Sequence, residues 1–163
     1  MIVLSHFKGH QMAGFGGALK NMSIGIASAS GKINIHTAGK GKVFEDSFKT
    51  DQNKFLESMA DADKSVADYL GKKNIVYISI ANKLSIDCDC SDHPKDPEMK
   101  DIGIFASTDP VALDQACVDS IYNSDDEGKE SLIKRIEDKN GIHIIESAER
   151  VGLGKRDYRI ITI

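Results

Sequence analysis

The sequence of 163 residues has no tryptophan and few aromatic residues, and these shortages exclude several classes of protein. Aromatic residues make up 6% of the chain, too few for the stacking surface on which single-stranded nucleic acid binds. Acidic residues outnumber basic ones by 25 to 21, so the chain lacks the positive charge that attracts nucleic acid or an anionic membrane. No apolar run approaches the length of a membrane span or of a signal-peptide core. We therefore expect a protein that binds neither nucleic acid nor a membrane.

Cysteine is also scarce, and the length is modest. Three cysteines cannot all pair with one another, which favours a cytoplasmic protein over a disulfide-stabilised secreted one. A chain of this length can build one hydrophobic core, so we expect residues 1–163 to form a single domain. Met1 is followed at once by an apolar run at residues 2–4, and this is also the pattern expected of a fragment or reduced form of a longer protein.

Short apolar runs alternate along the chain with segments of helical periodicity. Residues 2–4, 75–80 and 102–106 are predicted to be buried strands, residues 32–36 a half-buried strand, and residues 158–163 a closing strand. This alternation predicts an α/β fold with a mostly parallel sheet of about five strands and helices on both faces. One helix is predicted directly after a glycine-rich loop near the start of the chain. Four further helices are predicted at residues 51–70, 110–123, 129–139 and 142–151.

A glycine-rich stretch, SHFKGHQMAGFGGALKN at residues 5–21, follows the first predicted strand. Glycines allow the backbone to approach a ligand closely, and the helix that follows offers unpaired N–H groups. Gly16, Gly17, Lys20 and Asn21 are therefore candidates for binding a small anion. The alternative is a strand-to-helix turn without a ligand, because the stretch does not complete a known phosphate-binding motif.

Two histidines in the same stretch, His6 and His10, lie four residues apart. In a helix they would share one face, but Gly9 and the preceding strand argue against a helix here. Each histidine is a candidate ligand-binding residue, a general base or a hydrogen-bonded structural residue.

The second informative stretch is DCDC at residues 87–90. Cys88 and Cys90 lie two residues apart, so on an extended backbone both sulfurs point the same way and can bind one metal ion, with His93 as a third ligand. The neighbouring aspartates are expected to raise the pKa values of both thiols. A single zinc or iron ion is the expected cofactor, and a loop without a ligand is the alternative. Cys117 lies on the apolar face of a predicted helix and is expected in the core.

Asp109 precedes Pro110 and is either the N-cap of a helix or a catalytic or ligand-binding acid. It follows the predicted strand at residues 102–106, as His6 and the DCDC stretch follow other strands. Since the carboxyl ends of parallel strands meet at one edge of a sheet, we expect these groups to surround one cleft.

Four motifs occur along the chain in the order HFKGHQMAGFGGALKN, DCDC, DIGIFASTDPVALDQA and VGLGKRDYRI. Together they resemble the domain of unknown function 362 family of iron–sulfur-centre proteins. The resemblance implies an iron–sulfur cluster, carried in many members by a ferredoxin-like insert with two four-cysteine runs. Residues 37–49 stand in the place of that insert and contain no cysteine, so a partner domain or a separate ferredoxin module is the expected source of a cluster.

Three hypotheses for the function follow. The first is a metal- or iron–sulfur-associated α/β domain that forms part of a redox or metal-dependent enzyme. The second is a non-catalytic module that binds an anion or a partner, and the third is a structural remnant whose partner supplies the chemistry. Metal content distinguishes the first hypothesis from the others.

Overall fold

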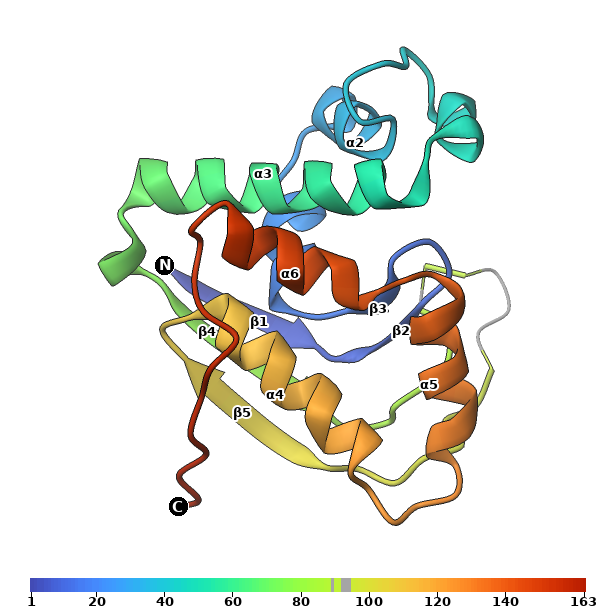
Figure 1. Cartoon of the computed structure of the whole chain (residues 1–163), viewed down its shortest axis with the longest axis vertical. Helices are drawn as coiled ribbons and strands as arrows, with labels where there is room; N and C mark the ends of the chain where they lie inside the picture. The colour runs from blue at the N-terminus through green and yellow to red at the C-terminus, as the bar shows by residue number, and fades with distance from the viewer. Residues whose placement is uncertain (89, 92–94) are drawn as a thin grey trace.

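A three-stranded sheet forms one layer of the computed structural model, with strand order β1-β4-β5 (Figure 1). Strands β1 and β4 are parallel, with Ile2 opposite Val76, whereas β4 and β5 are antiparallel, with Ile80 opposite Ile104. The prediction of a five-stranded, mostly parallel sheet is therefore wrong. The strands are β1 (Ile2–His6), β4 (Val76–Ala81) and β5 (Gly103–Ser107).

The direction of β5 follows from the connection that precedes it. The structure describes residues 1–88, 90–91 and 95–163, and the described part of the β4–β5 connection contains no helix. A parallel return would need a crossover connection, which is usually a helix, whereas an antiparallel return does not. An isolated bridge between Leu84 and Met99 holds the two arms of this connection together.

A small antiparallel hairpin, β2 (Lys8–His10) and β3 (Gly14–Gly16), accounts for the other two strands. It interrupts the glycine-rich stretch between β1 and the first helix. Gly14 has φ of 83°, a conformation that glycine adopts without the steric penalty of a side chain. Helix α5 (Lys129–Asp138) packs on the hairpin, so this unit is held against the rest of the chain.

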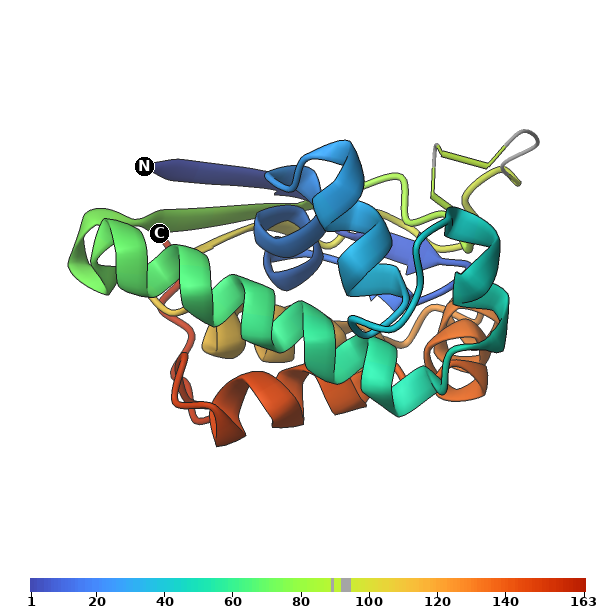
Figure 2. The same cartoon turned by 90° about the horizontal axis from the view of Figure 1, so that it is seen from above.

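The long helices lie on one side of the sheet (Figure 2). Helix α4 packs on β4 and β5, and α6 packs on α3 and α4. On the other side Ile2, Leu4 and Ile104 are more than half exposed, so the prediction of helices on both faces is also wrong for the described part of the chain. The helices are α3 (Gln52–Leu70), α4 (Pro110–Tyr122) and α6 (Ile142–Arg150), as the sequence predicted to within one or two residues.

Residues 32–36 were predicted to be a strand but belong to helix α2 (Ala29–His36). The Ser28 side chain accepts a hydrogen bond from the Gly31 N–H and caps this helix, which overrides the apolar–polar alternation. His36 then stacks on Phe55 of α3, with ring centroids 5.1 Å apart. The remaining short helical segments are α1 (Ala18–Lys20), the π-turn η1 (Asn21–Gly25) and the 3₁₀ turns η2 (Phe44–Lys49) and η3 (Lys72–Asn74).

The end of the chain, residues 158–163, was predicted to be a closing strand but is not a strand in the structure. Tyr158 anchors the start of this segment by donating a hydrogen bond to Asp119, while Ile160, Ile161 and Ile163 remain exposed. Their exposure explains the error, because β-forming side chains make a strand only where a sheet accepts them.

One cluster of buried apolar side chains lies between the sheet and the helices, with Leu19, Met59, Tyr77 and Ile121 among its fully buried members. Cys117 is part of it, which confirms the prediction of a core cysteine. Among the described residues, no helix is long and apolar enough to span a membrane.

Candidate metal and ligand site

The parallel pair β1 and β4 brings two distant segments to one edge of the sheet. His6 ends β1 opposite Ile80, and its Nε2 lies 2.7 Å from the carbonyl oxygen of Asn82, just beyond β4. Downstream, the Gly9 N–H donates to the Ser85 carbonyl at 2.8 Å. The hairpin and the segment leading to the DCDC stretch therefore run side by side.

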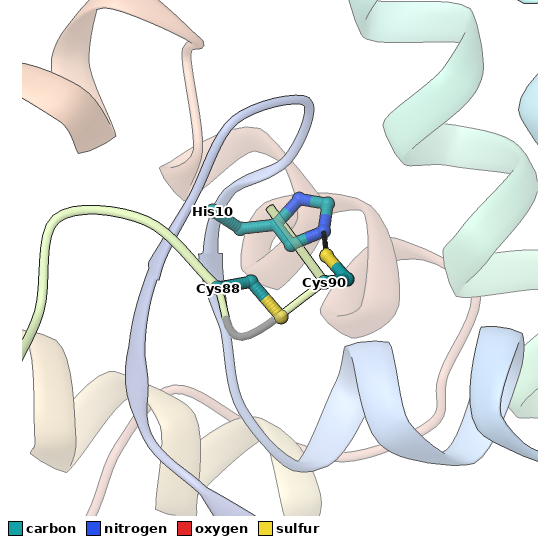
Figure 3. Close-up of side chains that lie close together, drawn as sticks. All are labelled: His10, Cys88 and Cys90. Atoms are coloured by element: carbon teal, nitrogen blue, oxygen red, sulfur yellow. Dashed lines mark hydrogen bonds between the residues drawn. The ribbon is translucent and has the colours of Figure 1, made fainter. Parts of the chain in front are cut away.

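Three side chains that can bind a metal ion lie close together where these two segments meet (Figure 3). The ligand atoms of His10, Cys88 and Cys90 all lie within 4.8 Å of one another. The Cys90 sulfur is 3.8 Å from His10 Nε2. The two cysteines were predicted to share a metal ion, and the third group in the described structure is His10. The predicted third ligand, His93, lies outside the described residues.

The His10 ring has a defined proton arrangement. Its Nδ1 accepts hydrogen bonds from the N–H groups of Met12 at 3.2 Å and Ala13 at 3.1 Å. In the neutral ring the proton is therefore on Nε2, the nitrogen that faces Cys90. Burial of the ring, together with the positive charge of Lys20, lowers the pKa of His10 to about 3, so the ring stays neutral at physiological pH.

The two thiols differ in their surroundings. Burial raises the pKa of Cys88, but hydrogen bonds with the backbone and side chain of Cys90 and the charge of Lys20 outweigh burial and lower it overall. Lys20 Nζ lies 4.0 Å from the Cys88 sulfur. Burial and the neighbouring Cys88 sulfur raise the pKa of Cys90. The expectation that aspartates raise both pKa values is thus wrong for Cys88, and Asp87 is instead paired with Arg135 at 3.0 Å.

A cavity of about 390 Å³ opens beside Cys88. Gly16 and Gly17 form part of its wall, and none of the described residues that line it is acidic. Asn21 shapes this wall by donating hydrogen bonds to the Leu4 carbonyl at 2.8 Å and to Ser5 Oγ at 3.1 Å. The polar or charged lining residues are Ser5, His6, Lys8, Lys20, Asn21, Lys32 and Cys88.

The start of α1 is not an open anion site, contrary to the expectation from the glycine-rich stretch. The N–H groups of Ala18 and Leu19 donate to the two carboxylate oxygens of Asp114, at 2.8 and 2.9 Å. A Cβ on Gly17 would lie 2.4 Å from one of these oxygens, so only glycine leaves room for this cap. An anion in the cavity would therefore depend on lysine side chains rather than on helix N–H groups.

Sequence reasoning missed Asp114, because an aspartate in the second turn of a helix cannot cap that helix. The available signal was a carboxylate between Leu113 and Cys117 on an otherwise apolar face. Asp114 is fully buried, which requires partners from another element.

Asp109 lies at the opposite edge of the sheet from His6. Because β5 is antiparallel, its last residue, Ser107, pairs with Tyr77 near the start of β4. Asp109 caps α4, with its Oδ1 accepting from Val111 N–H at 2.9 Å and Ala112 N–H at 3.1 Å. The predicted placement of Asp109 beside the cysteines is therefore wrong, whereas the cap is confirmed.

The family model named domain of unknown function 362 matches residues 1–119, which include the glycine-rich stretch, both clustered cysteines and most of α4. The chain belongs to this family. Comparisons with curated proteins and with solved structures give no significant match.

The residues of this domain fit a single ion better than a four-cysteine cluster. The sequence has three cysteines, and Cys117 is fully buried on α4 among apolar side chains. The described cluster offers two sulfurs and one imidazole nitrogen. A cluster held by four thiolates therefore lacks ligands in this chain, while a single soft ion has three groups at suitable spacing.

Proposed function

We propose that this domain binds one soft metal ion, such as Zn²⁺, through Cys88 and Cys90 with His10 as third ligand. The observation that carries the proposal is the convergence of three ligand atoms within 4.8 Å. His10 and Cys90 are 80 residues apart in the sequence, so their proximity is a property of the fold. Two sulfurs and an imidazole are a donor set that suits zinc.

Three ligands among the described residues leave a fourth position for water or substrate, as in catalytic zinc sites. The open position would lie near the cavity, because Cys88 belongs to both the cluster and the cavity wall. Lys20 and Lys32 line the same cavity and would attract a small anion such as a carboxylate or phosphate. This arrangement supports a metal-dependent or redox enzyme acting on an anionic substrate.

Metal binding by His10 requires a change in the protonation and orientation of its imidazole ring. An ion at Nε2 needs a lone pair there, which moves the ring proton to Nδ1. Nδ1 now accepts from the Met12 and Ala13 N–H groups, so the ring must turn away from them when the ion binds. We therefore expect His10 to contribute less affinity than either cysteine.

The proposal is tested by titrating metal-free protein, purified anaerobically, with Zn²⁺ in the presence of a chromophoric chelator. We expect one ion per chain, and at least about tenfold weaker binding in Cys88→Ser and in Cys90→Ser. His10→Ala should weaken binding by a smaller factor. Cys117→Ala and His143→Ala are matched controls, because both residues lie outside the cluster, and they should bind as the wild type does.

The result that would overturn the proposal is substoichiometric zinc in the wild type, or an affinity unchanged by both cysteine substitutions. The cavity lysines favour a second candidate in that case, a non-catalytic anion-binding module. Calorimetry with phosphate and acetate would test it, comparing Lys20→Ala with Lys73→Ala. Lys73 is exposed in the turn before β4, at the other edge of the sheet.

A further inference from the structure

The two clustered sulfurs face different groups, which gives them different roles when no ion is bound. Cys88 forms part of the cavity wall, and its sulfur lies 4.0 Å from Lys20 Nζ. Cys90 is not among the described residues that line the cavity, and its sulfur faces His10 Nε2 at 3.8 Å. A molecule in the cavity would therefore reach Cys88 first.

His10 presents a proton to Cys90 rather than a lone pair. Its Nδ1 accepts from two backbone N–H groups, so the neutral ring carries its proton on Nε2. The N–H group then points at the Cys90 sulfur and keeps it within 4.8 Å of the Cys88 sulfur. This is the opposite of the usual metal-bound histidine, which donates from its remote nitrogen to a carbonyl or carboxylate.

We propose that the metal-free Cys88–Cys90 pair reduces small anionic disulfides by thiol–disulfide exchange. The Cys88 thiolate attacks one sulfur of the substrate disulfide, forms a mixed disulfide and releases the first substrate thiol. The Cys90 sulfur then attacks Cys88, closes an intramolecular disulfide and releases the second substrate thiol. Two electrons pass from the cysteine pair to the substrate, and the two thiol protons end on the released thiols.

The charge of the cavity selects the substrate class. Lys20 and Lys32 line it, and none of its described lining residues is acidic. A disulfide that carries carboxylates is attracted to such a wall, whereas one that carries ammonium groups is repelled. The volume of the cavity, about 390 Å³, accommodates a small molecule rather than a protein loop.

This activity uses the same cysteines as the proposed metal site but needs no ion. The exchange proposal and the metal-binding proposal can therefore be refuted independently of each other. Zinc binding without exchange would overturn the exchange proposal alone. Exchange without zinc binding would overturn the metal proposal alone. Where both occur, bound zinc should block exchange, because it occupies both sulfurs.

The experiment uses the full chain, reduced, treated with EDTA and freed of reductant. It is mixed with dithiodipropionate, quenched by alkylation at intervals and analysed by mass spectrometry. We expect the wild type to form a Cys88–Cys90 disulfide and Cys90→Ser to stop at a mixed disulfide on Cys88. Cys88→Ser should lose the rapid reaction, and Cys117→Ala should behave as the wild type does.

The substrate class is tested with cystamine, a disulfide of similar size with two positive charges. Each rate is divided by the rate of the same disulfide with 2-mercaptoethanol, a small thiol without a further charged group, which corrects for intrinsic reactivity. We expect the anionic disulfide to be favoured by about tenfold, and Lys20→Gln but not Lys73→Gln to reduce this preference. Failure to form the Cys88–Cys90 disulfide would overturn the exchange, and equal normalised rates would overturn the assigned substrate class.

Discussion

At the scale of single residues, Gly9 decides where the cysteine-bearing segment lies. Its N–H donates to the Ser85 carbonyl at 2.8 Å, and a Cβ at this position would lie 1.9 Å from the Ile86 carbonyl oxygen. The hairpin and the segment before Cys88 can therefore lie together only because residue 9 has no side chain.

Gly9→Ala should separate His10 from the two cysteines. The added methyl group would collide with backbone rather than with a movable side chain, so we expect a loss of about 2 kcal/mol in the free energy of unfolding. Zinc affinity should fall at least about tenfold. Gly16→Ala is the control for stability, because its Cβ would meet only the flexible Lys20 side chain at 3.3 Å. Chemical denaturation and zinc titration measure both effects, and unchanged values for Gly9→Ala would contradict this account.

At the scale of elements, the start of α4 is held by one carboxylate. Asp109 accepts from Val111 and Ala112 through Oδ1, and from the Lys155 N–H through Oδ2 at 2.9 Å. It thereby joins the start of the helix to the segment after α6. Its role is structural in this arrangement, since it lies at the edge of the sheet opposite His6.

Asp109→Ala should lower the free energy of unfolding by about 1–2 kcal/mol, because the first turn of α4 loses its cap. Asp109→Asn keeps an oxygen that can accept from Val111 and Ala112, so it should lose less. Zinc affinity should not change in either variant. Thermal denaturation and zinc titration would check this. Weaker zinc binding in a folded Asp109→Asn variant would show that Asp109 contributes to the metal site.

At the scale of the whole molecule, two buried carboxyl groups lie between the helices. Burial raises the pKa of Asp114 to about 7, although its hydrogen bonds from Leu19 and Ala18 act in the opposite direction. Burial, and then the nearby Asp114, raise the pKa of Asp63 on α3 well above its usual range. Neither oxygen of the buried Asp63 carboxyl has a hydrogen-bond partner among the described residues. The interior therefore holds the pKa values of both carboxyl groups above that of a solvent-exposed aspartate.

Each of these two raised pKa values predicts a contribution to stability that falls as the pH rises. Between about pH 4, where an unfolded aspartate ionises, and pH 7, the pKa of Asp114, the Asp114 carboxyl keeps its proton in the folded state and loses it in the unfolded state. Such a contribution is lost with rising pH, by up to about 1.4 kcal/mol per pH unit for each carboxyl. The lowered pKa of His10 acts in the opposite direction below about pH 6.5, so the slope of the wild type is a sum of opposing contributions. Asp63→Asn should make the slope more positive than that of the wild type, because the amide does not ionise.

Urea denaturation at a series of pH values measures this dependence. Asp61→Asn is the matched control, since Asp61 is on the same helix but exposed to solvent, and it should leave the slope unchanged. A slope identical in the wild type and Asp63→Asn would show that Asp63 does not contribute.

Part of this protein was predictable because the signals are local. The caps at Asp51 and Asp109 and the periodic apolar residues that follow determine α3 and α4 within a few neighbouring residues. The spacing of Cys88 and Cys90 likewise indicated a shared site, since residues two apart on an extended backbone point the same way.

The rest depends on contacts between distant segments. His10 joins the cysteines because β1 pairs with β4 and Gly9 lies against the Ile86 carbonyl. Asp114 occupies the N–H groups of α1 because α4 packs against that helix. The direction of β5 depends on a connection without a described helix, and sequence periodicity is the same for both strand directions. Local patterns determine which segments are helices and strands, whereas the partners of a side chain or strand edge are determined only when the chain packs.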